Sequence, residues 1–208
     1  MMFAHARNTE TSLLSFAERP LKRWLAARVP RFVSTRMLTM ATLPLAVAAF
    51  ASSVAHWWNV TAALVAAQYL TDLVDGEVGR IRNSGHVRWG YHMDHLLDAV
   101  FVTAIFGGYL VALPGARPAA AALLVVCMLF LVNAHLESAA TGTTRLKRGR
   151  VGPTEIRVLL VVADLAMAGF GTGWFEAALP WIAATGAGLL AITVFHAQRA
   201  AATLDRSS

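Results

Sequence analysis

The sequence predicts an all-α polytopic membrane protein with six transmembrane helices and a short amphipathic surface helix before the first of them. Of its 208 residues, 57% are hydrophobic and only 14% are charged, whereas a soluble domain carries about 25% charged residues. A helix needs roughly 20 largely apolar residues to cross the hydrocarbon core of a bilayer. Six such stretches are present, at 37–56, 59–79, 94–113, 118–138, 154–173 and 179–198.

The segment before residue 37 is expected to form a helix on the membrane surface. Pro20 suits the first turn of a helix that runs over 21–29. Leu21, Trp24 and Leu25 would share one face, flanked by basic residues. Apolar burial and anionic lipid headgroups would hold such a helix at the surface. A solvated linker is the alternative.

The basic residues predict the orientation in the membrane. With six spans, all 18 Lys and Arg except Arg117 fall on the side of the two termini. This positive-inside pattern places both termini in the cytoplasm. It also accounts for the net charge of +6 without nucleic acid, so no nucleic-acid partner is expected. The chain then divides into a cytoplasmic segment 1–36, a six-helix domain 37–198 and a cytoplasmic tail 199–208.

The sequence gives no sign of a disulfide, of a cysteine-based metal site or of a signal peptide. Cys127, in the fourth predicted span, is the single cysteine, which excludes an internal disulfide and a cysteine-based metal site. No apolar core of a signal peptide precedes residue 37. We therefore expect the first span itself to direct membrane insertion.

Acidic residues at one end of the second and third spans mark the candidate site. An acidic side chain within a span is costly and by default functional. On the second span a single stripe with helical spacing is formed by Asp72, Asp75, Gly76, Gly79 and Arg80. On the third span, Asp94 and Asp98 are four residues apart and share a face. Neighbouring spans run in opposite directions, so both groups lie at the cytoplasmic level.

Four carboxylates gathered at one place predict a site for hard divalent cations. Close carboxylates repel, so at least one holds a proton unless cations intervene. Mg²⁺ and Mn²⁺ favour carboxylate oxygens, and two such ions about 4 Å apart clamp a diphosphate. Gly76 and Gly79 leave room for a nucleotide, and Arg80 supplies a positive donor. The alternative is a buried structural network of polar side chains.

The same residues resemble the motif of the CDP-alcohol phosphotransferase (CDP-alcohol phosphatidyltransferase) family. That motif reads D-x-x-D-G-x-x-A-R, about eight residues, then G-x-x-x-D-x-x-x-D. This chain reads Asp72-Leu-Val-Asp75-Gly76-Glu-Val-Gly79-Arg80, nine residues, then Gly90-Tyr-His-Met-Asp94-His-Leu-Leu-Asp98. Gly79 stands where the family has alanine, and the spacer is one residue longer. We expect both departures to affect the donor pocket rather than the metal site.

The resemblance implies a role for each position of the motif. The metal ligands it implies are Asp72, Asp75, Asp94 and Asp98. Asp98 would also be the catalytic base that deprotonates an acceptor hydroxyl, a role that suits a carboxylate of raised proton affinity. The positions implied to contact the CDP part of the donor are Gly76, Gly79 and Arg80. The family also implies a homodimer.

Polar residues at the same membrane level suggest an acceptor pocket formed by Arg157, Glu137 and His135. Arg157 suits bidentate contact with a phosphate or carboxylate, although an ion pair with Glu155 or Glu137 is equally favoured. Asp164 lies about 10 Å deeper at 1.5 Å per residue. A structural hydrogen bond inside the bundle is the expected role of Asp164.

The sequence leaves the acceptor alcohol open. Asp94-His95 resembles the branch that transfers choline or ethanolamine phosphate to diacylglycerol, and this CDP-aminoalcohol reaction is the alternative function. The short chain is more similar to bacterial enzymes that join CDP-diacylglycerol to a small polar alcohol and release CMP. That resemblance implies the bacterial inner membrane and an active site on the cytoplasmic side. His86, His92 and His95 surround the motif, but four aspartates already offer a hard-cation site.

Two other classes of protein have weaker support. A cation transporter would need acidic groups through both leaflets, whereas the outer halves of the predicted spans are almost free of charge. A catalytically silent membrane scaffold is disfavoured because the motif keeps every carboxylate. We therefore predict a membrane enzyme of phospholipid biosynthesis.

Overall fold

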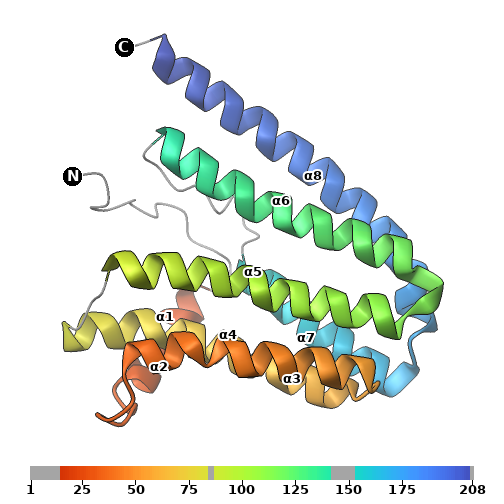
Figure 1. Ribbon diagram of the computed structural model, residues 1–208, viewed down its shortest axis with the longest axis horizontal. Coiled ribbons are helices and arrows are strands. Elements are labelled where there is room, and N and C mark those ends of the chain that lie inside the picture. The colour runs from red at the N-terminus through yellow and green to blue at the C-terminus, as the bar shows by residue number, and fades with distance from the viewer. Residues whose placement is uncertain (1–14, 84–86, 142–152, 207–208) are drawn as a thin grey trace.

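The computed structural model describes residues 15–83, 87–141 and 153–206, and every regular element in these ranges is a helix (Figure 1). The prediction of an all-α fold is therefore confirmed. In chain order the elements are α1 (Ser15–Ala26), α2 (Thr35–Met40), α3 (Thr42–Val54), α4 (Trp58–Arg82), α5 (Val87–Ala112), the 3-10 helix η1 (Pro114–Ala116), α6 (Arg117–Thr141), α7 (Pro153–Phe170) and α8 (Gly173–Asp205).

Four segments are long and apolar enough to cross a membrane, which makes this an integral membrane protein. They are Thr35–Val54, Arg88–Ala112, Pro114–Thr141 and Gly173–Asp205. The other two long helices, α4 and α7, do not meet that standard. Both carry polar side chains along their length, including Asp72 and Asp75 on α4 and Arg157 and Asp164 on α7. The count of six spans thus remains a prediction that depends on these two helices.

The first predicted span is interrupted. Helix α2 ends at Met40, and α3 begins at Thr42. Pro44 lies in the first turn of α3 and has no N–H to donate to the carbonyl of Met40, while its ring crowds that carbonyl. The interruption therefore falls one turn before the proline.

The N-terminal helix is present but shifted from its predicted bounds. The prediction placed it at 21–29 with Pro20 in the first turn, whereas α1 runs Ser15–Ala26 and contains Pro20 in its interior. Pro20 removes only one hydrogen bond from this short helix. Ala26 is buried with Val74 and Val78 of α4, while Leu21 and Trp24 stay exposed. Residues 1–14 lie outside the described ranges.

The long helices lie side by side as an elongated bundle. Helix α5 packs on α3 and α6, α4 packs on α3 and α7, and α8 packs along α6. Figure 1 shows α6 and α8 along one edge of the bundle, with the end of α8 projecting beyond its neighbours. At 33 residues, α8 is about 50 Å long, which exceeds the roughly 30 Å of a hydrocarbon core.

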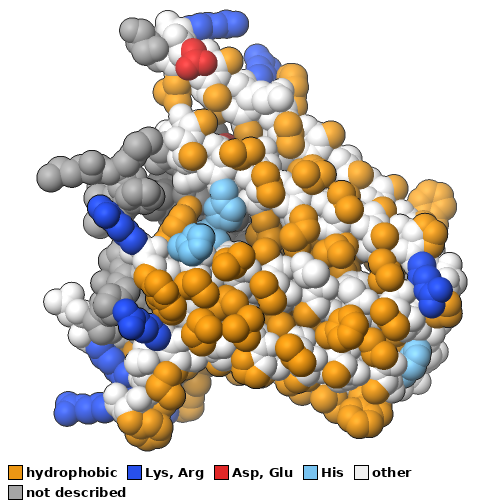
Figure 2. Space-filling model, in the orientation of Figure 1, with side chains coloured by type: hydrophobic (Ala, Val, Ile, Leu, Met, Phe, Trp, Pro, Cys, Tyr) orange, Lys and Arg blue, Asp and Glu red, His pale blue; other side chains and the backbone are white. Residues whose placement is uncertain are grey.

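The apolar core lies away from the acidic motif, towards the η1 end of the bundle. Tyr109, Ile105, Leu113, Met167 and Leu179 are almost fully buried there. Hydrophobic side chains also spread over the face of the bundle shown in Figure 2, and Lys and Arg lie near the margins of that face. Such a surface matches a lipid environment. Side chains of α4, α5 and α7 share this core with those of α3, and the core so sets the positions of their polar side chains.

Candidate active site

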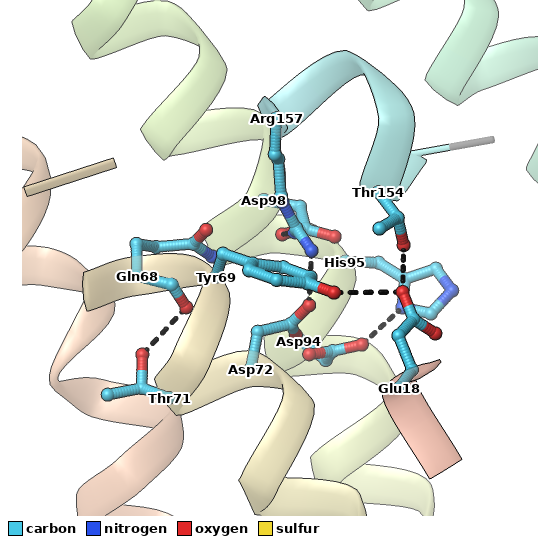
Figure 3. A network of polar contacts seen from close by, with 10 residues as sticks. All are labelled: Glu18, Gln68, Tyr69, Thr71, Asp72, Asp94, His95, Asp98, Thr154 and Arg157. Carbon is cyan, nitrogen blue, oxygen red and sulfur yellow. Dashed lines mark hydrogen bonds and ion pairs between the residues drawn. The ribbon is translucent and has the colours of Figure 1, made fainter. Parts of the chain in front are cut away.

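The centre of the site is Arg157 of α7, whose guanidinium bridges carboxylates from two other helices. Nη1 donates a hydrogen bond of 2.5 Å to Oδ2 of Asp72 on α4, and Nη2 donates one of 2.8 Å to Oδ1 of Asp98 on α5 (Figure 3). The Arg157 side chain is only 16% exposed. Three helices therefore meet at a largely buried, charge-assisted contact of a kind that is short and strong.

Asp94 joins the same cluster from α5. It lies within electrostatic reach of both Asp72 and Asp98, and its Oδ2 lies 3.4 Å from Nδ1 of His95. The His95 ring contacts that of His135 on α6, with centroids 4.5 Å apart, and that of Tyr91, at 4.3 Å. His135 was predicted as an acceptor-pocket residue, and this contact brings it beside the carboxylate cluster.

Asp75 is hydrogen-bonded to helix α2. Its Oδ2 accepts a hydrogen bond from Oγ1 of Thr39 on α2 over 2.5 Å. Asp94 lies within electrostatic reach of Asp75. The structure thus gathers the four predicted aspartates at one end of α4 and α5, with Asp72, Asp94 and Asp98 closest to Arg157.

The glycines of the motif leave space along α4. A Cβ added to Gly76 would meet no atom within 4 Å, and a Cβ added to Gly79 would lie 3.6 Å from Cγ2 of Thr35. Gly76 therefore faces open space beside the carboxylates, where a ligand can approach the helix backbone. The methyl group of the family's alanine would fit at position 79 in ordinary contact.

Arg80 is exposed and pairs with a different acid. Its Nη1 lies 2.7 Å from Oε2 of Glu77, and its side chain is 71% exposed. Arg23 of α1 approaches the same carboxylate at 3.9 Å. Glu77 therefore orients Arg80, a contact that sequence analysis did not predict.

The remaining predicted polar residues have mixed outcomes. Asp164 accepts a hydrogen bond from Tyr109 over 2.6 Å in the core, which confirms a structural role. Glu137 is only 4% exposed, and neither of its carboxylate oxygens has a hydrogen-bond partner. The alternative of an Arg157–Glu137 ion pair is therefore wrong. His86 lies outside the described residues.

A second set of contacts links α1 to the site. Oε1 of Glu18 accepts hydrogen bonds from the hydroxyl of Tyr69 on α4, at 2.9 Å, and from Oγ1 of Thr154 on α7, at 2.6 Å (Figure 3). The Tyr69 ring centre lies 5.9 Å from the guanidinium carbon of Arg157. Tyr69 is three residues before Asp72 and Thr154 is three before Arg157, so helical spacing was a usable signal for both. Glu18 had no such signal.

The donor set fits a hard divalent cation, because it consists of carboxylates from two facing helices. Among the described residues, however, no three His, Cys, Asp or Glu side chains form a ready coordination site. Asp72 and Asp98 are instead bonded to Arg157. The fit therefore concerns the chemistry of the ligands and not a preformed coordination geometry.

Comparison with known proteins identifies the family of this chain. The model of the CDP-alcohol phosphatidyltransferase family matches residues 32–195, a family that generally depends on a divalent metal. The fold is similar to that of phosphatidylinositol phosphate synthase from Mycobacterium tuberculosis, with 19% sequence identity, a TM-score of 0.64, and coverage of 87% of this chain and 94% of that one. A search of curated protein sequences gave no significant match.

The family match includes the whole acidic motif and most of the chain, whereas the structural likeness supports the fold alone. The protein therefore belongs to the CDP-alcohol phosphatidyltransferase family and is a membrane enzyme that transfers a phosphatidyl group from a CDP-linked donor to an alcohol in phospholipid synthesis.

Proposed function

We propose that this enzyme joins CDP-diacylglycerol to a small polar alcohol and releases CMP. The observation that carries the proposal is the meeting of Asp72 and Asp98 from α4 and α5 at one buried arginine. These two carboxylates are the first and last acids of the motif. Because both contact Arg157, the two halves of the motif lie together. Transfer of an aminoalcohol phosphate from CDP to diacylglycerol is the alternative within the same family.

In this proposal the metal ligands are Asp72, Asp75, Asp94 and Asp98, and they hold Mg²⁺ or Mn²⁺, as two ions. When bound, such ions neutralise the donor diphosphate and stabilise charge on the departing phosphate of CMP. Thr39 orients Asp75, and His95 orients Asp94. These neighbours act through the carboxylates, as supporting residues around a metal site generally do.

Asp98 acts as the base. It takes the proton from the acceptor hydroxyl, the oxygen forms a bond to the phosphorus of the phosphatidyl group, and the bond from that phosphorus to CMP breaks. The position of Asp98 at the junction of α5 and α7 suits this role, since a base must lie within hydrogen-bond reach of the proton it removes. Positioning and charge neutralisation supply most of the rate.

The two substrates approach from different sides of Asp98. Gly76, Gly79 and Arg80 contact the CDP part of the donor, because Gly76 opens onto free space and Arg80 is held beside it by Glu77. Arg157, His135 and Glu137 form the acceptor pocket. Divalent ions held by these carboxylates would supply the charge neutralisation that Arg157 provides here, and the planar guanidinium of Arg157 suits a phosphate or carboxylate of the acceptor.

We further propose the topology implied by the charge pattern. Six helices span the bacterial inner membrane, both termini and the site face the cytoplasm, and α1 lies on the membrane surface. Its exposed Leu21 and Trp24 suit that position. The six-helix part, 37–198, contains the catalytic residues, between the cytoplasmic segments 1–36 and 199–208. The active form is a homodimer.

The test is an acceptor panel. Purified protein is incubated with CDP-diacylglycerol, Mg²⁺ or Mn²⁺, and separately with inositol phosphate, glycerol phosphate, serine or diacylglycerol, while CMP is measured. Acceptor-dependent CMP release with a small polar alcohol supports the proposal. Release only when CDP-choline or CDP-ethanolamine is given together with diacylglycerol would transfer support to the alternative.

A further inference from the structure

We propose that Glu18 of α1 is a positioning residue, which joins α4 to α7 next to Arg157 and so fixes the guanidinium for catalysis. The proposal deepens the function proposed above and rests on the role given there to Arg157. Glu18 lies outside the acidic motif and outside the matched range of residues 32–195.

The contact is a three-way junction. One oxygen of Glu18 accepts hydrogen bonds from Tyr69 on α4 and from Thr154 on α7. A carboxylate can accept several hydrogen bonds, and bonds to a charged acceptor are about twice as strong as neutral ones. We call these three residues the Glu18 bridge. It is the described contact through which α1 reaches both helices at once.

Each partner of Glu18 lies one helical turn from a residue of the site. Tyr69 is three residues from Asp72 on α4, and Thr154 is three residues from Arg157 on α7, a spacing that places side chains on one helix face. The Tyr69 ring is also 5.9 Å from the Arg157 guanidinium carbon, a cation–π distance. Movement of Tyr69 therefore reaches Arg157 directly, and movement of Thr154 reaches it through α7.

The remainder of α1 is anchored at its other end. Ala26 packs with Val74 and Val78, and Arg82 donates hydrogen bonds to the carbonyl oxygens of Val29 and Val33 just after α1. Near the start of α1, Glu18 makes the polar contact that joins this helix to both α4 and α7. The helix is thus fixed on α4 at its C-terminal end and closed onto the site by the bridge.

The carboxylate of Glu18 makes this contact stronger than a neutral acceptor would. Hydrogen bonds to a charged acceptor are about twice as strong as those between neutral groups. The amide oxygen of a glutamine at this position could accept the same two hydrogen bonds from Tyr69 and Thr154, but as weaker contacts.

The experiment compares Glu18→Ala, Glu18→Gln, Tyr69→Phe and Thr154→Val in full-length protein in lipid nanodiscs. Lys22→Ala, one turn further along α1, is the control for Glu18→Ala. Thr203→Val removes a hydroxyl that donates to the carbonyl of Arg199 within α8, and it is the control for Thr154→Val. CMP release gives kcat and KM, thermal unfolding gives Tm, and hydrogen exchange reports on the amides of α1.

We expect Glu18→Ala to lower kcat about tenfold, since small misplacements near reacting groups are costly, with Tm close to that of the parent protein. Exchange in the first half of α1 should become faster. Glu18→Gln should recover part of the loss, because its amide oxygen accepts both bonds but as weaker, neutral contacts. The double variant Glu18→Ala/Tyr69→Phe should be no slower than Glu18→Ala, since one contact is removed only once.

Parent-like kcat in Glu18→Ala would overturn the proposal. So would a fall that follows Tm and that glutamine does not rescue. If the parent protein releases no CMP with any acceptor, the proposed function fails, whereas unchanged exchange in Glu18→Ala would refute the bridge independently of any activity.

Discussion

Arg157 on α7 donates a hydrogen bond of 2.5 Å from Nη1 to Oδ2 of Asp72 on α4. The same guanidinium reaches Asp98 on α5, so one arginine holds the two halves of the acidic motif together. This contact is the physical link between a helix that carries no motif residue and the two that do.

Replacement of Arg157 by lysine should lower kcat/KM about 10- to 100-fold. Lysine keeps the charge but has no planar fork with which to contact Asp72 and Asp98 together, or to hold a phosphate by two bonds. Steady-state CMP release measures the effect. Arg199→Lys, on the exposed part of α8, is the control and should be neutral. A lysine variant with parental kinetics would exclude bidentate contact by Arg157.

Removal of divalent ions should abolish turnover, and Asp75→Asn should raise the metal concentration that gives half-maximal rate by about tenfold or more, as loss of a coordinating group or its support generally does. Titration of Mg²⁺ and Mn²⁺ after treatment with EDTA measures this. Asp205→Asn at the end of α8 should titrate like the parent. Full activity in EDTA would remove the metal from the account.

The two motif glycines should respond differently to the same substitution. A methyl group at Gly79 would be in ordinary contact with Thr35, so Gly79→Ala should keep parental activity. The position of Gly76 faces open space beside the carboxylates, so Gly76→Ala should leave Tm unchanged but raise the KM for the CDP donor several-fold. Equal KM values for both variants would argue that the nucleotide does not approach α4 here.

Tyr109→Phe should destabilise the protein by about 1–3 kcal/mol, the cost of leaving a buried polar group without its partner. Asp164 would lose the hydrogen bond to Oδ1, and its other oxygen already has no partner. Thermal unfolding in detergent measures the loss, with Tyr91→Phe as the control. An unchanged Tm would mean that Asp164 gains nothing from Tyr109. The kcat of the remaining folded protein should stay near that of the parent.

The sequence was sufficient for the helical fold because long apolar stretches leave few other solutions in a membrane. Where predicted bounds were wrong, local backbone effects explain the difference. Pro44 separates α2 from α3, and Pro20 lies inside α1 instead of starting it. The hydrophobic pattern alone does not show where the helix ends lie relative to these two prolines.

Helical spacing predicted which residues of the candidate site share a face of one helix. It grouped Asp72 with Asp75 and Asp94 with Asp98, and the opposite directions of α4 and α5 placed the two pairs at one level. It gave no information on contacts between distant segments. The contacts of Arg157 with Asp72 and Asp98, and of Glu18 with Tyr69 and Thr154, depend on how whole helices pack. The pairing of Glu77 with Arg80 lies within α4 at a spacing of three residues, so helical spacing offered a signal for it.

The most direct test of the account is the turnover of Asp98→Asn. Asparagine keeps the shape of the side chain but can neither accept a proton from the acceptor nor contribute a negative charge. With an acceptor identified for the parent protein, CMP release by Asp98→Asn should fall by at least about a thousandfold, within the range of general base catalysis, while Tm and helix content stay parental. Near-parental turnover by this variant would contradict the assignment of Asp98 as the base.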